Sequence, residues 1–215
     1  PRTSSAASDV YKRQALMRQA QSVKKGVKKF GGTPREFCTI TVTDGIAMGH
    51  EGMKSSLISR EIIADSAELT VRGHCYDALV GIAGCDKSLP GLMMSMLRLN
   101  VPSVFIYGGS ILPGRFKGKD VTVVDVFEAV GKHSSGSMSS KELRELELVA
   151  CPSAGACGGQ FTANTMACVS EAIGLALPYS AGTPAPYEER DKYAFESGQT
   201  VTVSYTHLTL PTLFE

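Results

Sequence analysis

Two short apolar runs that end in glycine constrain the fold of this chain most. Residues 78–84 (ALVGIAG) and 103–109 (SVFIYGG) carry almost no polar side chains, which is typical of strands buried on both faces. Segments with apolar residues at helical spacing lie before and after each run. Because strands that alternate with helices form parallel sheets covered on both sides, we predict a three-layer α/β/α fold with a mostly parallel sheet.

The remaining segments follow the same alternation of strands and helices. A further strand is predicted over residues 37–43 (FCTITVT), which are rich in β-branched side chains. Ser139 or Ser140 is placed to cap a helix that begins near residue 141. Helices are predicted over residues 15–30, 55–71, 91–99, 121–130, 141–149 and 161–177.

Composition and charge exclude several classes of partner. The 215 residues carry 22 basic and 21 acidic side chains, and no basic block alternates with aromatic residues, so we expect no nucleic-acid partner. We expect no membrane partner, because no apolar stretch of about 18 residues is present. The six cysteines are irregularly spaced and no secretory leader is visible, so we expect reduced thiols in a cytoplasmic protein.

The two ends of the chain differ in character from the rest. Residues 4–14 (SSAASDVYKRQ) match the translation of a transposase adapter used in sequencing libraries, and the reverse complement of that adapter encodes residues 203–212 (VSYTHLTLPT). No structural reason accounts for this inverted repeat, so we expect residues 1–14 and 202–215 to be adapter-derived and disordered. The α/β domain is then expected to cover residues 15–201, as a truncated piece of a longer protein.

Reactive side chains follow two of the predicted strands. Asp44 follows the first strand, and Cys85, Asp86 and Lys87 follow the second. Parallel sheets bind ligands at the carboxyl ends of their strands. From spacing alone, a turn that uses Asp86 as a local acceptor explains the second group as well as a functional site does, and Asp44 before glycine is ordinary turn chemistry.

A glycine-rich segment, residues 151–166 (CPSAGACGGQFTANTM), leads into the last predicted helix. Its glycines let the backbone approach a ligand and direct amide groups toward it, while the absence of a GK[ST] ending argues against a P-loop. A thiol in such surroundings is favoured as thiolate, the form that ligates iron. Cys157 is the better candidate, because Cys151 follows an apolar helix end and is explained by simple burial.

Three segments, in order, resemble the dihydroxy-acid dehydratase branch of the dihydroxy-acid and 6-phosphogluconate dehydratase family. They are DGIAMGHEGMKSSLISREIIADSAE, GCDKSLPGLMMSMLRLN and the glycine-rich segment. The similarity extends over residues 19–200. It implies a hydro-lyase that converts a small 2,3-dihydroxy-3-methyl carboxylic acid to a 2-oxo acid in the synthesis of valine and isoleucine.

The resemblance also implies cofactors and the residues that hold them. Cys85 and Cys157 map onto two of three cysteines that bind an iron–sulfur cluster, with [2Fe-2S] favoured over [4Fe-4S]. Asp44, Asp86 and Lys87 map onto the ligands of a magnesium ion, and the lysine is carbamylated in relatives. Carbamylation converts an ammonium into an anionic oxygen ligand, which suits Mg²⁺ because this ion prefers hard oxygen donors.

Other parts of the machinery implied by the resemblance lie outside this chain. In relatives the first cluster cysteine lies upstream of the position of Ala15, and a C-terminal domain supplies the serine base and a glutamate ligand. We therefore assign no catalytic residue here and expect the 215 residues to be inactive alone. Cys38 stands where relatives usually carry asparagine, so it is not assigned as the missing ligand. Relatives are homodimers, and the same is expected of the longer protein.

Two alternatives stay open at the level of sequence. A sugar-acid dehydratase, acting on an aldonate or on 6-phosphogluconate, would change only the substrate. A non-catalytic iron–sulfur or phosphate-binding module would need a complete ligand set within residues 15–201, where only two matched cysteines lie. His50 beside Glu51 suggests a metal pair, but a hydrogen-bonded loop histidine is the simpler interpretation.

Overall fold

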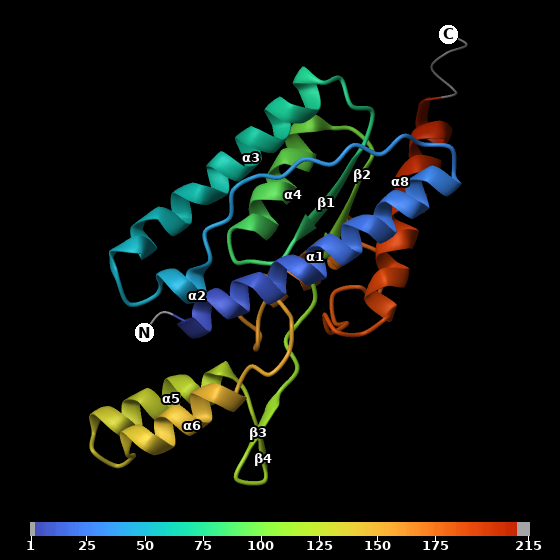
Figure 1. Ribbon diagram of the computed structural model, residues 1–215. Coiled ribbons are helices and arrows are strands. Elements are labelled where there is room, and N and C mark those ends of the chain that lie inside the picture. The colour runs from blue at the N-terminus through green and yellow to red at the C-terminus, as the bar shows by residue number, and fades with distance from the viewer. Residues whose placement is uncertain (1–2, 210–215) are drawn as a thin grey trace.

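The computed structural model describes residues 3–209, with side chains described from residue 15 to residue 207. A parallel pair of strands lies between two groups of helices (Figure 1). In chain order the elements are α1 (Thr3–Lys29), α2 (Asp44–Ala47), the 3-10 helix η1 (Glu51–Ser55), α3 (Ser56–Gly73), β1 (Leu79–Ala83), α4 (Ser88–Leu99), β2 (Ser103–Tyr107), β3 (Gly114–Phe116), β4 (Lys119–Val121), α5 (Val123–Ser134), α6 (Ser140–Val149), α7 (Thr162–Ala172) and α8 (Glu189–Thr209).

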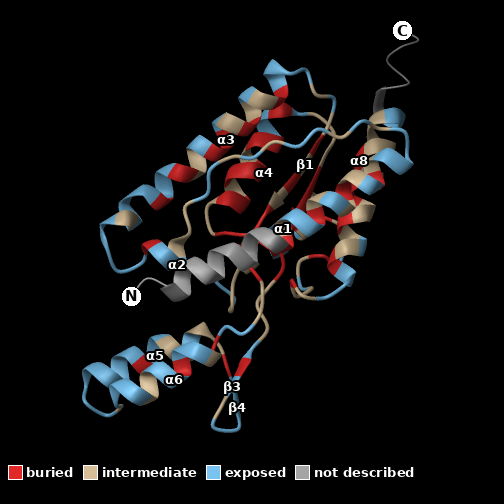
Figure 2. Ribbon diagram, viewed as in Figure 1, coloured by how far each residue is buried: buried red, intermediate tan, exposed pale blue. Residues whose placement is uncertain are grey.

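The strands β1 and β2 form the middle layer and divide two hydrophobic cores. Their register pairs Leu79 with Ser103 and Ala83 with Tyr107. Because side chains alternate along a strand, Phe105 belongs to the core shared with α3, α4 and α7, whereas Ile106 belongs to the core shared with α1 and α8. Figure 2 shows the buried residues concentrated on these strands and on the facing sides of the helices. The predicted three-layer α/β architecture is confirmed.

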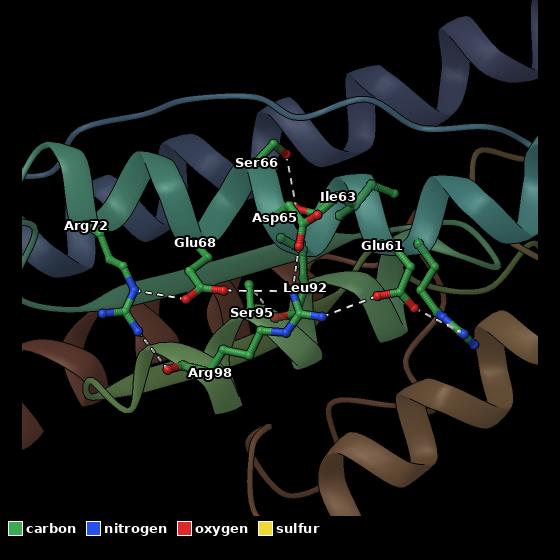
Figure 3. A network of polar contacts seen from close by, with 10 residues as sticks. Glu61, Ile63, Asp65, Ser66, Glu68, Arg72, Leu92, Ser95 and Arg98 are labelled. Carbon is green, nitrogen blue, oxygen red and sulfur yellow. Dashed lines mark hydrogen bonds and ion pairs between the residues drawn. The ribbon is translucent and has the colours of Figure 1, made fainter.

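Helix α4 lies close to α3 because Gly91 has no side chain at the contact. A Cβ at Gly91 would lie 2.9 Å from Cγ2 of Ile63 and equally close to the backbone of α3. At the exposed edge of the same pair, the Arg98 guanidinium contacts Asp65 at 2.6 Å and Glu61 at 3.3 Å (Figure 3). Water screens ion pairs at such an edge, so apolar packing, more than these ion pairs, holds α3 on α4.

The prediction of a strand over residues 37–43 is wrong. This segment is not part of a sheet, and the side chain of Thr39 hydrogen-bonds Ser66 of α3 at 2.6 Å. In the described part of the chain, the parallel sheet consists of β1 and β2, and isolated parallel bridges join Phe105 to Ala176 and Ser110 to Pro184. β-Branched residues favour extended backbone, but a strand also needs a neighbour for its backbone hydrogen bonds.

Most of the predicted helices are confirmed, with shifted ends. The Ser139 side chain caps α6 by accepting a hydrogen bond from the Glu142 amide at 3.2 Å, as expected. The helix predicted over residues 161–177 ends earlier, at Ala172, because Gly174 adopts a φ of +79°, a left-handed conformation that stops a helix. Five predicted helices correspond, in order, to α1, α3, α4, α5 and α6.

The β3–β4 hairpin is not predicted from the sequence, although its turn carries a local signal. Lys117 and Gly118 adopt φ values of +49° and +80°, as the two central residues of a type I′ turn do. The hairpin leads into α5 and α6, and these elements share a small core of their own, formed by Val121, Ala129, Leu146 and Ala150. This unit lies apart from the main sheet (Figure 1).

Helix α8 is also not predicted, and it packs along α1. A Cβ at Gly26 would collide with the backbone of Phe195, and one at Gly198 with the backbone of Val23, so glycine permits the close approach. Neither of these long helices, nor any other in the described part of the chain, is apolar enough to cross a membrane.

Residues 3–14 and 202–209 are helical, whereas disorder was expected there. They continue α1 and α8, whose middle parts pack on each other, and a helix extends from a packed segment more easily than it nucleates. The rest of the two segments for which disorder was expected, residues 1–2 and 210–215, lies outside the described residues. The adapter origin of the two ends and the domain limits at residues 15 and 201 stay predictions.

Replacing Gly91 by alanine tests the close contact of α4 with α3. Alanine is the better helix former, but its methyl group would meet α3 at 2.9 Å, so we expect the free energy of unfolding to fall by about 1–3 kcal/mol. Gly131→Ala in α5 is the matched control, because a Cβ there meets nothing within 4 Å, and it should gain about 0.5–1 kcal/mol. Urea unfolding followed by circular dichroism measures both, and a gain in both variants would contradict the packing.

Candidate functional site

The glycine-rich segment that carries Cys157 is fastened to the loop after β2. The amide of Ala156 donates to the carbonyl of Gly109 at 2.8 Å, and the amide of Ile111 donates to the carbonyl of Cys157 at 2.9 Å. Cys157 therefore lies beside the carboxyl end of β2, at the edge where parallel sheets bind ligands.

Cys85 follows β1 and lies beside the same segment. A Cβ at Gly84 would be 3.4 Å from Cβ of Ala156, and these two residues directly precede Cys85 and Cys157. Cys85 is buried and Cys157 is half-buried. The two thiols therefore belong to neighbouring loops at one edge of the sheet.

A small hollow between these loops has walls that carry few side chains. It is lined by Ala15, Leu16, Gly84, Gly108, Gly155 and Ala156. A Cβ at Gly108 would come within 2.7 Å of Cδ2 of Leu16, and one at Gly155 within 2.6 Å of the Ile111 amide nitrogen. Glycine is thus needed for the backbone segments to approach this closely, and two of the lining residues, Gly84 and Ala156, directly precede Cys85 and Cys157.

Asp44, Asp86 and Lys87 form one ion-paired cluster next to the cysteines. Lys87 Nζ donates to Asp44 Oδ2 at 2.9 Å and also to Asp86 Oδ2, and the three side chains are only 14–17% exposed. Ser56 Oγ donates to the other oxygen of Asp44 at 2.5 Å, and Thr162 hydrogen-bonds Asp86. Both carboxylates are therefore directed toward one point, where the lysine ammonium lies.

The pKa values in this cluster reflect competition between burial and pairing. Burial opposes ionisation of Asp86, but hydrogen bonds with Lys87 and Thr162 outweigh it and lower the pKa of Asp86. Burial also opposes the charge on Lys87, but its contacts with Asp86 and Asp44 prevail and raise its pKa. Lys87 is therefore an ammonium at neutral pH in this arrangement.

The donors in this region suit two kinds of metal centre. No group of three His, Cys, Asp or Glu side chains within the described residues is close enough to hold a metal ion. Two carboxylates that already converge on one cation are nevertheless the donors that Mg²⁺ prefers. Two thiols on adjacent glycine-rich loops are the donors that iron–sulfur clusters use. Each set fits its metal but needs at least one more ligand.

The five residues predicted for the site are brought together at one edge of the sheet: Asp44, Cys85, Asp86, Lys87 and Cys157. Their roles as ligands stay a prediction. Sequence reasoning missed Ser56 and Thr162, which orient the two aspartates. Each is the first residue of its helix, a position where a hydroxyl residue is usually interpreted as a cap.

Cys151, Cys38 and His50 were considered from the sequence but are not among these five residues. Cys151 is exposed, so the alternative that burial explains it is wrong. Cys38 is also exposed and lies in the segment that precedes α2. His50 accepts a hydrogen bond from the Gly52 amide at 3.0 Å through Nδ1, and its Nε2 lies 2.8 Å from the carbonyl of Ile46. The interpretation of His50 as a hydrogen-bonded loop histidine is confirmed.

Comparison with known proteins identifies relatives over most of the chain. Residues 4–212 match the family model described as dihydroxy-acid/6-phosphogluconate dehydratase, N-terminal. A dihydroxy-acid dehydratase of Pelagibacter ubique is 91% identical over 187 residues, which are 87% of this chain and 33% of the relative. Those of Parvibaculum lavamentivorans and Metallosphaera sedula are 83% and 55% identical, over 87% and 86% of this chain and 32% and 33% of the relatives. The chain thus spans about a third of the length of the curated relatives it matches.

Replacing Lys87 by methionine tests the charge balance of the cluster. Asp44 and Asp86 would lose their shared cation, so we expect the free energy of unfolding to fall by roughly 2–4 kcal/mol at pH 7. Pairing lowers the pKa of Asp86, so its contribution to wild-type stability is present at neutral pH and lost in acid. The difference between variant and wild type should therefore persist down to about pH 4 and shrink as the pH falls further.

The free energy of unfolding of the variant and of the wild type is measured by chemical denaturation from neutral to acid pH. Lys54→Met is the control, because Lys54 pairs with Glu51 on the surface, where their side chains are 78% and 85% exposed, and its stability should hardly change. A deficit in the Lys87 variant that stays constant with pH would contradict the coupling of the three charges.

Proposed function

The chain belongs to the dihydroxy-acid/6-phosphogluconate dehydratase family, and from this membership we propose that residues 15–201 are the N-terminal α/β part of a dihydroxy-acid dehydratase. The longer protein would convert a 2,3-dihydroxy-3-methyl carboxylic acid to a 2-oxo acid in branched-chain amino-acid synthesis. The convergence of the five predicted residues at one sheet edge carries this proposal.

Cys85 and Cys157 are proposed to hold an iron–sulfur cluster of the [2Fe-2S] type, with a third thiolate from outside residues 15–201. The close approach of their loops at the carboxyl ends of β1 and β2 supports this assignment. Asp44 and Asp86 are proposed to bind Mg²⁺ together with carbamylated Lys87. When bound, these groups would supply Lewis acidity to the departing hydroxyl and neutralise charge on the substrate carboxylate.

The residues of this chain contribute mainly by orientation. Ser56 and Thr162 hold the carboxylates of Asp44 and Asp86 by hydrogen bonds. The Lys87 ammonium keeps the two carboxylates together, and carbamylation would exchange its positive charge for an anionic oxygen ligand. The base that removes the C2 proton is assigned to a residue outside residues 15–201.

The location and assembly of the longer protein are part of the same proposal. We place it in the cytoplasm as a homodimer, as the family resemblance implies.

The test uses a full-length chimaera, in which the matched residues of this chain replace the 187 corresponding residues of the Pelagibacter ubique relative. Purified without oxygen, the chimaera should show visible iron–sulfur absorbance and form a keto acid from 2,3-dihydroxyisovalerate. Cys157→Ser should lose the absorbance, because it removes a ligand. Cys151→Ser is the matched control from the same segment and should keep it.

The possible outcomes separate the alternatives. A colourless chimaera would contradict the cofactor assignment. Loss of absorbance in the Cys151 variant instead of the Cys157 variant would move the ligand to Cys151. Turnover of gluconate or 6-phosphogluconate, without turnover of the dihydroxy acid, would assign the chain to the sugar-acid branch.

A further inference from the structure

Tyr107 is linked to the Cys157 loop through the side chain of Asn164. The Tyr107 hydroxyl hydrogen-bonds Asn164 Oδ1, and Asn164 Nδ2 donates to the carbonyl of Gly159 at 2.5 Å. Gly159 is two residues after Cys157 in the same loop. A continuous series of contacts therefore runs from the end of β2, through the first turn of α7, to the loop.

Tyr107 is itself held rigidly. Its side chain is buried, with the residue only 1% exposed. Arg190 of α8, which is also buried, donates to the Tyr107 carbonyl at 2.6 Å and places its guanidinium 5.7 Å from the ring centre. A side chain fixed by both packing and hydrogen bonds can hold its partner in one orientation.

The hydrogen bonds on its two sides fix the orientation of the Asn164 amide. Burial, followed by the nearby Cys157 sulfur, raises the pKa of Tyr107, so the phenol keeps its proton and acts as the donor. Asn164 then presents its carbonyl oxygen to Tyr107 and its NH₂ group to Gly159. The Tyr107 hydroxyl and the Gly159 carbonyl therefore require the same orientation of the amide.

We propose that Tyr107 and Asn164 are positioning residues that hold the Cys157 loop in its cluster-binding conformation. This rests on the proposed function, because it takes Cys157 as a cluster ligand. The loop needs such support, since glycines at 155, 158 and 159 leave its backbone with little stiffness of its own. The Ile111 amide holds the carbonyl of Cys157 at 2.9 Å, and Asn164 holds Gly159 beyond it.

The experiment measures cluster retention in the full-length chimaera. Asn164→Asp keeps the size of the side chain and its bond from Tyr107, but it sets a carboxylate oxygen against the Gly159 carbonyl. We expect an iron chelator to bleach this variant about 10-fold faster than wild type, in the range typical of groups that support metal ligands. Tyr107→Phe should accelerate bleaching in the same direction. Tyr179→Phe is the control, since Tyr179 is 81% exposed, and should bleach at the wild-type rate.

A second comparison separates positioning from general stability. The variant Tyr107→Phe/Asn164→Leu should bleach no faster than Asn164→Leu alone, because the two residues act through one series of contacts. Thermal unfolding of the metal-free proteins is measured in parallel. Wild-type bleaching rates in the variants, or rates that only follow their melting temperatures, would overturn the proposal. A colourless wild-type chimaera would instead contradict the proposed function, and this inference with it.

Discussion

The parallel pairing of β1 with β2 is the interaction on which the site depends. Ala83 and Tyr107 are partners at the ends of the strands, and the next residues stay together because the Gly108 amide donates to the carbonyl of Ala83 at 2.8 Å. Whatever follows the two strands therefore emerges at one edge. A shift of one residue would turn Phe105 and Ile106 toward the wrong cores, so the two apolar faces secure the register that positions Cys85.

Close approach of backbone segments and buried charge are two further constraints on the candidate site. Glycine brings the Cys157 segment, β1 and β2 together around a hollow, as it does for the packing of α3 on α4 and of α1 on α8. Asp44, Asp86 and Lys87 are costly to remove from water, and only their mutual contacts offset that cost. At the edge of the sheet, where both features occur together, they are typical of a site that binds charged ligands.

The sequence predicts those parts of the structure that depend on local pattern. Apolar runs buried on both faces predict β1 and β2, and reactive residues directly after strands predict where Asp86 and Cys85 lie. The strand expected over residues 37–43 is absent, because strand formation depends on a partner distant in sequence. The roles of Thr162 and Asn164 could not be predicted for the same reason. Each has a hydrogen-bond partner that is distant in sequence and becomes a neighbour only when α7 packs against the ends of the strands.

Diffraction at the iron absorption edge, from crystals of the full-length chimaera grown without oxygen, tests the central claim most directly. We predict an anomalous peak between the Sγ atoms of Cys85 and Cys157, at the carboxyl ends of β1 and β2. Iron bound at Cys151, or anywhere away from that edge, would contradict it.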